Sequence, residues 1–179
     1  MKYLLIIVTA FIVSHAFAKD ILIVDFGGKR KLINTHKYSE TGKITTYTVE
    51  GTFTDNLANY GAWDSMVITQ IENGKIVTMD FSTMWEYQNS NKVYFRGRRG
   101  NSDEDTGIGK VVVIGASNSM TSLIDTKCTY SIKILNENVF GVQKCELSND
   151  AFKTLKDLER WFFFLSILIS LFFFILNAE

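Results

Sequence analysis

An alternation of outward and inward side chains with a period of two residues restricts the possible folds of this chain more than any other sequence feature. It is clearest in "KITTYTVEGTF", where every second residue would lie on one face of a strand. That face carries Thr45, Tyr47, Val49, Gly51 and Phe53. The opposite face is polar, so the pattern predicts an antiparallel strand that is wet on one side.

Hairpin signals extend this pattern along the chain. In "SMVITQIENGKIVTMDFSTMW" two apolar runs flank Asn73-Gly74, the favoured central pair of a type I′ turn. Further strand-like runs cover residues 21–24, 92–96 and 110–114, and "DAFKTLKDLER" is the one helical stretch between the chain ends. About eight short strands predict an all-β fold, either a sandwich or a closed antiparallel barrel. We favour the barrel, which leaves no edge exposed and encloses packed side chains or one small ligand.

The two cysteines of the chain fall in the last predicted hairpin, "CTYSIKILNENVFGVQKC". A turn centred between Asn136 and Glu137 places Ile134 opposite Val139. The same register places Cys128 directly opposite Cys145. Opposed Cβ atoms on antiparallel strands are close to the separation that a disulfide requires. We therefore expect a Cys128–Cys145 disulfide, with two free thiols as the alternative.

The N-terminus has the features of an export signal. Lys2 precedes the apolar run "LLIIVTAFIV", and Ala16-Phe17-Ala18 is a small-x-small cleavage site. We expect a signal peptide at residues 1–18 and a mature barrel domain at residues 19–149. Export also favours the disulfide, because exported proteins fold in oxidising surroundings.

The C-terminus ends in the apolar run "RWFFFLSILISLFFFILNAE". We expect residues 150–160 to form a helical linker and residues 161–177 a transmembrane or anchor helix, which makes the membrane a partner. The charges around this run do not follow the positive-inside rule. The alternative is a lipid-anchor signal that is removed after attachment at Asn149. The two interpretations place the domain at a bacterial cell envelope or, in the lipid-anchor case, at a eukaryotic cell surface.

Two serines within that run have the spacing of a helix contact. Ser166 and Ser170 are four residues apart, so they share one helix face and permit close packing of a second copy. A homo-oligomer formed through these residues is one interpretation. The other is that each hydroxyl bonds a carbonyl one turn back.

The middle of the chain resembles a known group of small exported barrels. The order is "GTFTDNLANYGAWDS", then "TGIGKVVVIGASNS", then the cysteine hairpin. It is similar to barrels of the allene-oxide-cyclase and dirigent type, in which a Gly-x-Gly turn leads into a strand ending at another glycine, as Gly107 and Gly109 lead to Gly115 here. The resemblance implies an eight-stranded barrel with a cavity, in families that include cyclases and guides of radical coupling. It transfers no catalytic residue to this sequence.

Composition restricts the chemistry. The chain has 19 basic and 19 acidic residues, so it lacks the positive charge of a nucleic-acid-binding protein. After signal removal, His36 is the one remaining histidine, and its segment "KLINTHKYSETGK" is turn-like. We therefore expect no metal site, no cofactor and no histidine-dependent catalytic triad.

Three residues are candidate ligand contacts. Asp80 would be an acid in the cavity if the polar face of its strand points inward, with Trp85 nearby, and would be an ordinary surface residue if that face points to water. Arg96 belongs to "RGRRGNSDED", which we expect to be a loop whose arginines either hold an anion or pair with the neighbouring acids. The sequence thus predicts a membrane-tethered binding module for a small apolar or amphipathic ligand. The alternatives are a cyclase or lyase and a structural protein with a filled barrel.

Overall fold

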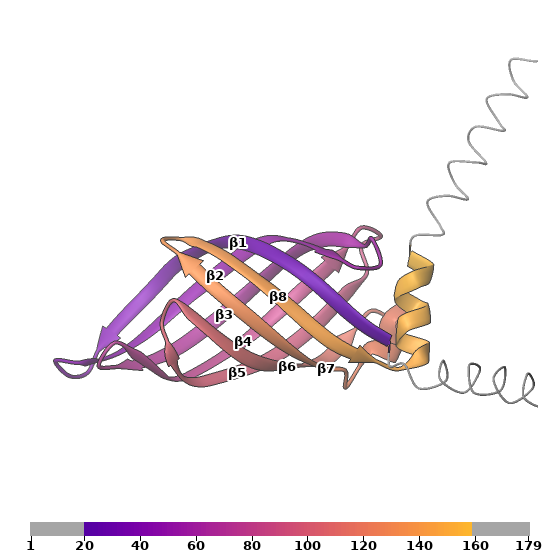
Figure 1. Cartoon of the computed structure of the whole chain (residues 1–179). Helices are drawn as coiled ribbons and strands as arrows, with labels where there is room; N and C mark the ends of the chain where they lie inside the picture. Colours follow the sequence, from indigo (N-terminus) through magenta and orange to yellow (C-terminus); the bar gives the residue numbers. More distant parts are fainter. Residues whose placement is uncertain (1–19, 159–179) are drawn as a thin grey trace, which may run out of the picture.

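The computed structural model describes residues 20–158 and shows a closed antiparallel barrel in which each strand pairs with the next and β8 pairs with β1 (Figure 1). The strands are β1 (Asp20–Lys37), β2 (Gly42–Asp55), β3 (Tyr60–Glu72), β4 (Lys75–Tyr87), β5 (Lys92–Asp103), β6 (Thr106–Ala116), β7 (Lys127–Leu135) and β8 (Asn138–Leu147). The prediction of an eight-stranded antiparallel barrel is confirmed. The signal peptide, the segment 161–177 and its Ser166 and Ser170 lie outside the described residues.

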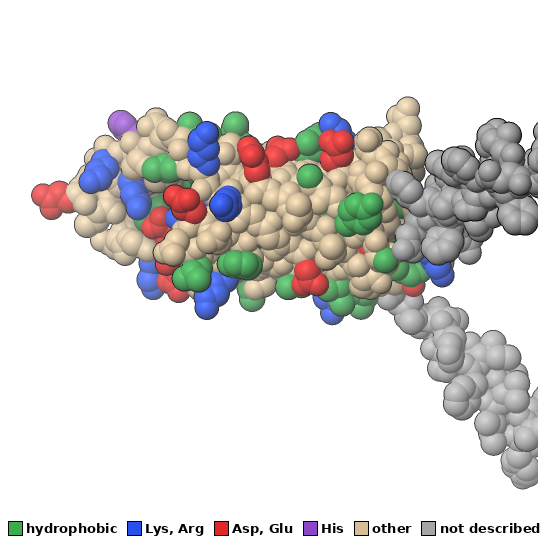
Figure 2. Space-filling model, turned by 90° about the horizontal axis from the view of Figure 1, so that it is seen from above, with side chains coloured by type: hydrophobic (Ala, Val, Ile, Leu, Met, Phe, Trp, Pro, Cys, Tyr) green, Lys and Arg blue, Asp and Glu red, His purple; other side chains and the backbone are tan. Residues whose placement is uncertain are grey.

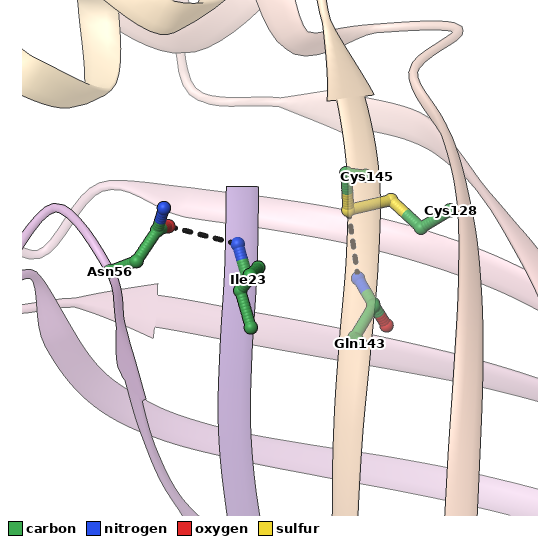
Figure 3. Close-up of a disulfide and its surroundings, with 5 residues drawn as sticks. All are labelled: Ile23, Asn56, Cys128, Gln143 and Cys145. Atoms are coloured by element: carbon green, nitrogen blue, oxygen red, sulfur yellow. Dashed lines mark hydrogen bonds between the residues drawn. A yellow bond between two sulfur atoms is a disulfide. The ribbon is translucent and has the colours of Figure 1, made fainter. Parts of the chain in front are cut away.

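Local turn chemistry sets the strand register as expected. Asn73 and Gly74 have φ angles of 52° and 74°, the left-handed values that a type I′ turn requires. In the last hairpin Ile134 pairs with Val139, and Cys128 pairs with Cys145. The two cysteines form a disulfide, with Cα atoms 4.1 Å apart, near the end of the barrel where β1 begins and β8 ends (Figure 3).

Two segments that we expected to be turns or loops belong to long strands. β5 continues through Asp103, so "RGRRGNSD" is a strand and not a loop. β1 has 18 residues and includes His36, which is exposed as expected. Both segments keep their backbone hydrogen bonds because β2 pairs with β1 as far as Lys37, and β4 pairs with β5 as far as Asp103. In these additional strand residues the side chains continue to alternate between the inside and the outside of the barrel.

The barrel interior is filled mainly by apolar and aromatic side chains. On β2 the inward residues include Tyr47, Val49 and Phe53, which agrees with the predicted face. The ring of Trp85 stacks on Phe53 with centroids 4.6 Å apart and lies 4.7 Å from the ring centroid of Phe95. These rings form a continuous aromatic core in the half of the barrel nearest the strand ends at Asp55 and Tyr87.

A short helix covers this end of the barrel. Residues 149–158 are helical and lie across this end of the barrel (Figure 1). Ala151 and Leu155 of this helix are fully buried, as is Met120 of the 3-10 helix η1 (Asn118–Leu123). The buried Asn59 connects the C-terminal helix to the end of β2, because its amide donates to Leu155 O at 3.2 Å and to Asp55 Oδ2 at 3.0 Å. The hairpin turns β1–β2, β3–β4, β5–β6 and β7–β8 lie at the opposite end, which this helix does not cover.

Candidate functional site

A cavity of about 70 Å³ lies inside the barrel, beyond the aromatic core. Its walls come from β1 to β5, β7 and β8 and are mostly apolar or aromatic. The lining residues are Phe26, Tyr47, Val49, Trp63, Ser65, Val67, Met79, Phe81, Thr83, Trp85, Arg99, Tyr130, Ile132, Ile134 and Val139. An apolar cavity with a few polar groups is the usual form of a small-molecule site.

Several polar groups of this wall already bond to the protein. The Ser65 hydroxyl lies 3.0 Å from Ser82 O and 2.8 Å from Thr83 Oγ1. The indole N–H of Trp63 donates to Gly27 O at 3.1 Å and to Thr52 O at 3.2 Å. These groups are therefore part of the barrel wall, and their hydrogen-bonding capacity is largely used by it.

Arg99 and Tyr130 differ from the other polar groups of the lining. Arg99 is 4% exposed, and its Nε, Nη1 and Nη2 atoms are buried without a hydrogen-bond partner anywhere in residues 20–158. The Tyr130 hydroxyl is also buried and without a partner in that part of the chain. Leaving a buried polar group unpaired costs free energy, and a charged group costs most. An arrangement of this kind is rare in a purely structural core, which makes the surroundings of Arg99 and Tyr130 a candidate ligand site.

The strand pattern explains why an arginine lies inside. Val93, Phe95, Gly97 and Arg99 occupy alternate positions of β5, and all four are buried. Across from them, β6 presents glycines to the interior: a Cβ on Gly107 would overlap Arg99 Nη1, and a Cβ on Gly109 would overlap the Tyr130 ring. The absence of side chains at Gly107 and Gly109 therefore creates the space in which the Arg99 and Tyr130 side chains lie.

The electrostatics of the cavity favour protonated phenols. Burial raises the pKa of Tyr130 to about 12, an effect that the charge of Arg99 partly offsets. Burial also raises the pKa of Tyr47, against the nearby charges of Arg99 and Arg30. The Arg30 guanidinium lies 5.6 Å from the centroid of the Tyr47 ring. Among the described residues that line the cavity, Arg99 is the one cation and none is a carboxylate, although the charge of Glu104 also raises the pKa of Tyr47. Tyr130 is therefore a hydrogen-bond donor near neutral pH.

Raising the pH should destabilise the fold through Tyr130. Because the folded-state pKa of about 12 is above the ordinary value of 10, the contribution of this group is complete below pH 10 and is lost between pH 10 and pH 12. We expect Tyr130→Phe to reduce this alkaline loss, measured by urea unfolding at several pH values. The exposed Tyr60 provides the matched control, Tyr60→Phe. Equal alkaline loss in wild type and Tyr130→Phe would contradict the expectation.

The structure separates the three predicted ligand contacts. Trp85 is 3% exposed and lines the cavity. Asp80 and Arg96 lie on the outer wall, where Asp80 accepts a 2.9 Å hydrogen bond from Arg98 Nε. The polar face of this strand therefore points to water, which is the second of the two alternatives for Asp80. The role of Trp85 in ligand binding stays a prediction.

Asp80 and Arg96 nevertheless line a second, open depression of about 1170 Å³ on the outer wall. It is bordered by side chains of both charges, including Lys110 and Glu146. On the face shown in Figure 2, basic and acidic side chains are likewise interspersed. Exposed pairs such as Arg98 and Asp80 are well solvated and gain little from a ligand. The smaller inner cavity is therefore the better candidate, because its guanidinium is shielded from bulk water.

Arg99 is the functional candidate that our interpretation of the sequence missed. We expected its segment to be a loop, so Arg99 had no assigned face. Extending the alternation from Val93 and Phe95 by two more steps would have placed Arg99 inside the barrel. A charged residue at an inward position of a strand is the signal that identifies it.

Within residues 20–158 no group of three or more His, Cys, Asp or Glu side chains is arranged to hold a metal ion. The same range contains no helix with the length and apolar character needed to cross a bilayer.

Comparison with known proteins supports the architecture. No family model and no curated protein matches the sequence. The fold is similar to the crystal structure of an enzyme from Penicillium herquei, with a TM-score of 0.57 and 10% identity over 72% of this chain and 95% of that one. A protein of unknown function from Clostridium acetobutylicum gives a TM-score of 0.49 and 11% identity, over 72% of this chain and 96% of that one. The similarity concerns the eight-stranded barrel and assigns no family.

Proposed function

We propose that the barrel is a binding module that encloses a small amphipathic molecule between its aromatic core and the end formed by the hairpin turns. The observation that carries this proposal is the inner cavity, whose lining is almost entirely apolar but includes the unpartnered polar groups of Arg99 and Tyr130. Such a lining suits a ligand with an apolar body and one polar end. Trp63 and Trp85 in the lining would provide contact area and report on binding.

The proposal includes export and attachment to a membrane. The disulfide is compatible with export. The alternative of lipid attachment at Asn149 would remove residues 150–158, although Ala151 and Leu155 are fully buried against the barrel end. Loss of that buried surface would expose the aromatic core, so we favour retention of the C-terminal segment. An intact mass of the mature protein tests this, and a chain ending at Asn149 with a lipid would overturn it.

Ligand entry can be tested by filling the cavity. The full chain is titrated with propanol, propionamide and propionate, and binding is followed by tryptophan fluorescence. We expect saturable binding of at least one compound to wild type and a loss of at least tenfold in affinity for Val67→Phe. The added ring would occupy the cavity that Val67 lines. Ile68→Phe is the matched control, since Ile68 is the next residue of β3 and is 52% exposed.

Circular dichroism checks that each variant keeps the barrel. Met79→Phe, at another lining position, provides a second filled cavity if Val67→Phe does not fold. The proposal fails if none of the three compounds binds to wild type. It also fails if binding is unchanged in a folded variant with a filled cavity.

The observations favour binding over the two alternative functions. The cyclase or lyase alternative relied on Asp80 as a cavity acid, but Asp80 is on the outer wall, and among the described residues no Asp or Glu lines the cavity. The structural alternative predicts a completely filled interior. The aromatic core is filled in this way, but the region around Arg99 is not.

A further inference from the structure

The position of Arg99 restricts the polar end of the ligand. Its guanidinium has three buried nitrogen atoms without a partner in the described chain, and it lines the cavity. A guanidinium has no acceptor and cannot be neutralised at ordinary pH, so only acceptors can satisfy it. No acidic side chain of the described lining supplies one. A ligand can supply the complementary group, and an anionic acceptor compensates the charge as well as the hydrogen bonds.

The surroundings favour a carboxylate over other anions. A carboxylate matches the two parallel N–H donors of a guanidinium and carries a single negative charge. The Tyr130 hydroxyl, which burial keeps protonated, adds a further donor. A phosphate dianion would bring a second charge that no other cation of the lining balances. The apolar remainder of the lining favours a carbon chain over a halide ion.

The size of the cavity limits that carbon chain. Its volume is about 70 Å³. An apolar cavity of about 150 Å³ accommodates benzene. This cavity has roughly half of that volume and therefore suits a smaller molecule. Acids of two to four carbons fit without displacing the tightly packed aromatic core.

We propose that Arg99 and Tyr130 bind the carboxylate of a short-chain monocarboxylic acid inside the barrel, with the alkyl chain against the aromatic wall. This inference rests on the proposed binding function and names its ligand class. Gly107 and Gly109 belong to the same site, because any larger residue there would displace the Arg99 or the Tyr130 side chain.

The test compares charged and neutral ligands of equal shape. The full chain is titrated with acetate, propionate and butyrate, with the neutral propionamide, and with octanoate, chloride and inorganic phosphate. We expect wild type to bind propionate at least tenfold more tightly than propionamide, since hydrogen bonds to a buried charge contribute on this scale. Octanoate, chloride and phosphate should each bind at least tenfold more weakly than propionate.

Variants then assign the preference to residues. Arg99→Met should lose the preference for propionate over propionamide while its affinity for propionamide changes by less than about threefold. Arg99→Lys keeps the charge but not the two-pronged donor, so it should restore part of the preference. Tyr130→Phe should weaken propionate binding by about threefold to tenfold. Arg98→Met, at the adjacent outward position of β5, is the matched control and should behave as wild type.

Each outcome separates this inference from the proposed function. If propionamide binds as tightly as propionate, or if Arg99→Met keeps the preference, the carboxylate assignment is overturned while cavity binding stands. If octanoate, chloride or phosphate binds more tightly than propionate, the short-acid assignment is overturned. If none of propanol, propionamide and propionate binds to wild type, or if binding is unchanged in a folded Val67→Phe, the binding function itself is overturned.

Discussion

Replacing Arg99 by methionine should raise the free energy of unfolding by about 1–4 kcal/mol, the range found when buried ion pairs are replaced by apolar side chains of similar volume. Arg99 is 4% exposed and has no hydrogen-bond partner for its guanidinium in the described chain. Folding must therefore remove a charge from water without giving it a protein partner. Methionine keeps an unbranched chain that can follow the same path past Gly107, and it removes the charge.

The matched control for this result is Arg98→Met. Arg98 is the next residue of β5, but its side chain is 72% exposed and pairs with Asp80 on the outer wall. Removing an exposed pair of this kind changes stability by less than about 1 kcal/mol. Urea unfolding of the three proteins gives the comparison, in the absence of added carboxylates. A fall in stability of Arg99→Met by 1 kcal/mol or more would show that Arg99 supports the fold rather than a ligand.

A stabilising substitution at this position has a functional meaning. Most core substitutions destabilise a protein, and exceptions concentrate where a residue is kept for function at the expense of stability. A ligand that accepts hydrogen bonds from Arg99 should stabilise wild type and so reduce its difference in stability from Arg99→Met. Propionate should accordingly stabilise wild type and leave Arg99→Met almost unchanged, because stabilisation follows the affinity for the folded state.

The barrel topology was accessible from the sequence because its signals are local. Alternation with a period of two defines each strand, and Asn73-Gly74 defines a hairpin turn without help from the rest of the fold. The cysteine register followed from the turn between Asn136 and Glu137 alone. In an antiparallel meander, correct hairpins fix most neighbour relations, and closure of β1 on β8 then removes the last two edges.

It was harder to predict from the sequence which side chains face the inside of the barrel, because this depends on where the strands bulge and how long they are. A strict alternation along β4 would place Val77 with Met79 and Phe81, but a register shift beside Val77 leaves it exposed while Ile76 and Met79 both face inward. Because this part of β5 was expected to be a loop, the inward position of Arg99 was not predicted. A polar sequence such as "RGRRGNSD" forms a strand here because β4 supplies the pairing partners.

The helical cover of the barrel end also depends on distant contacts. Residues 150–160 were expected to form a helical linker, but nothing local indicates that Leu155 packs on the barrel near Asn59, which is 96 residues away. A second contact with this helix comes from η1, where the hydroxyls of Ser122 and Thr154 lie 2.9 Å apart. Contacts between segments so far apart in sequence are set by the completed barrel and not by local propensity.

Removal of the Cys128–Cys145 disulfide should lower the free energy of unfolding by about 3 kcal/mol. The two residues are 17 apart in sequence, and the bridge reduces the entropy of the unfolded chain by closing that loop. Both sulfurs belong to buried residues, so the double variant Cys128→Ala/Cys145→Ala also loses a small apolar contact. Urea unfolding in oxidising and reducing buffer measures the effect.

The same experiment contains its control. A reducing agent should lower the stability of wild type by about as much as the double substitution does, and should leave the double variant unchanged. The barrel should still form in both cases, since β7 and β8 retain their pairing from Thr129 to Leu135 and close against β6 and β1. Stability that is insensitive to reduction would mean that the hairpin holds its register without the bridge. The disulfide would then offer the domain no advantage in an oxidising compartment, which would remove the structural support for export.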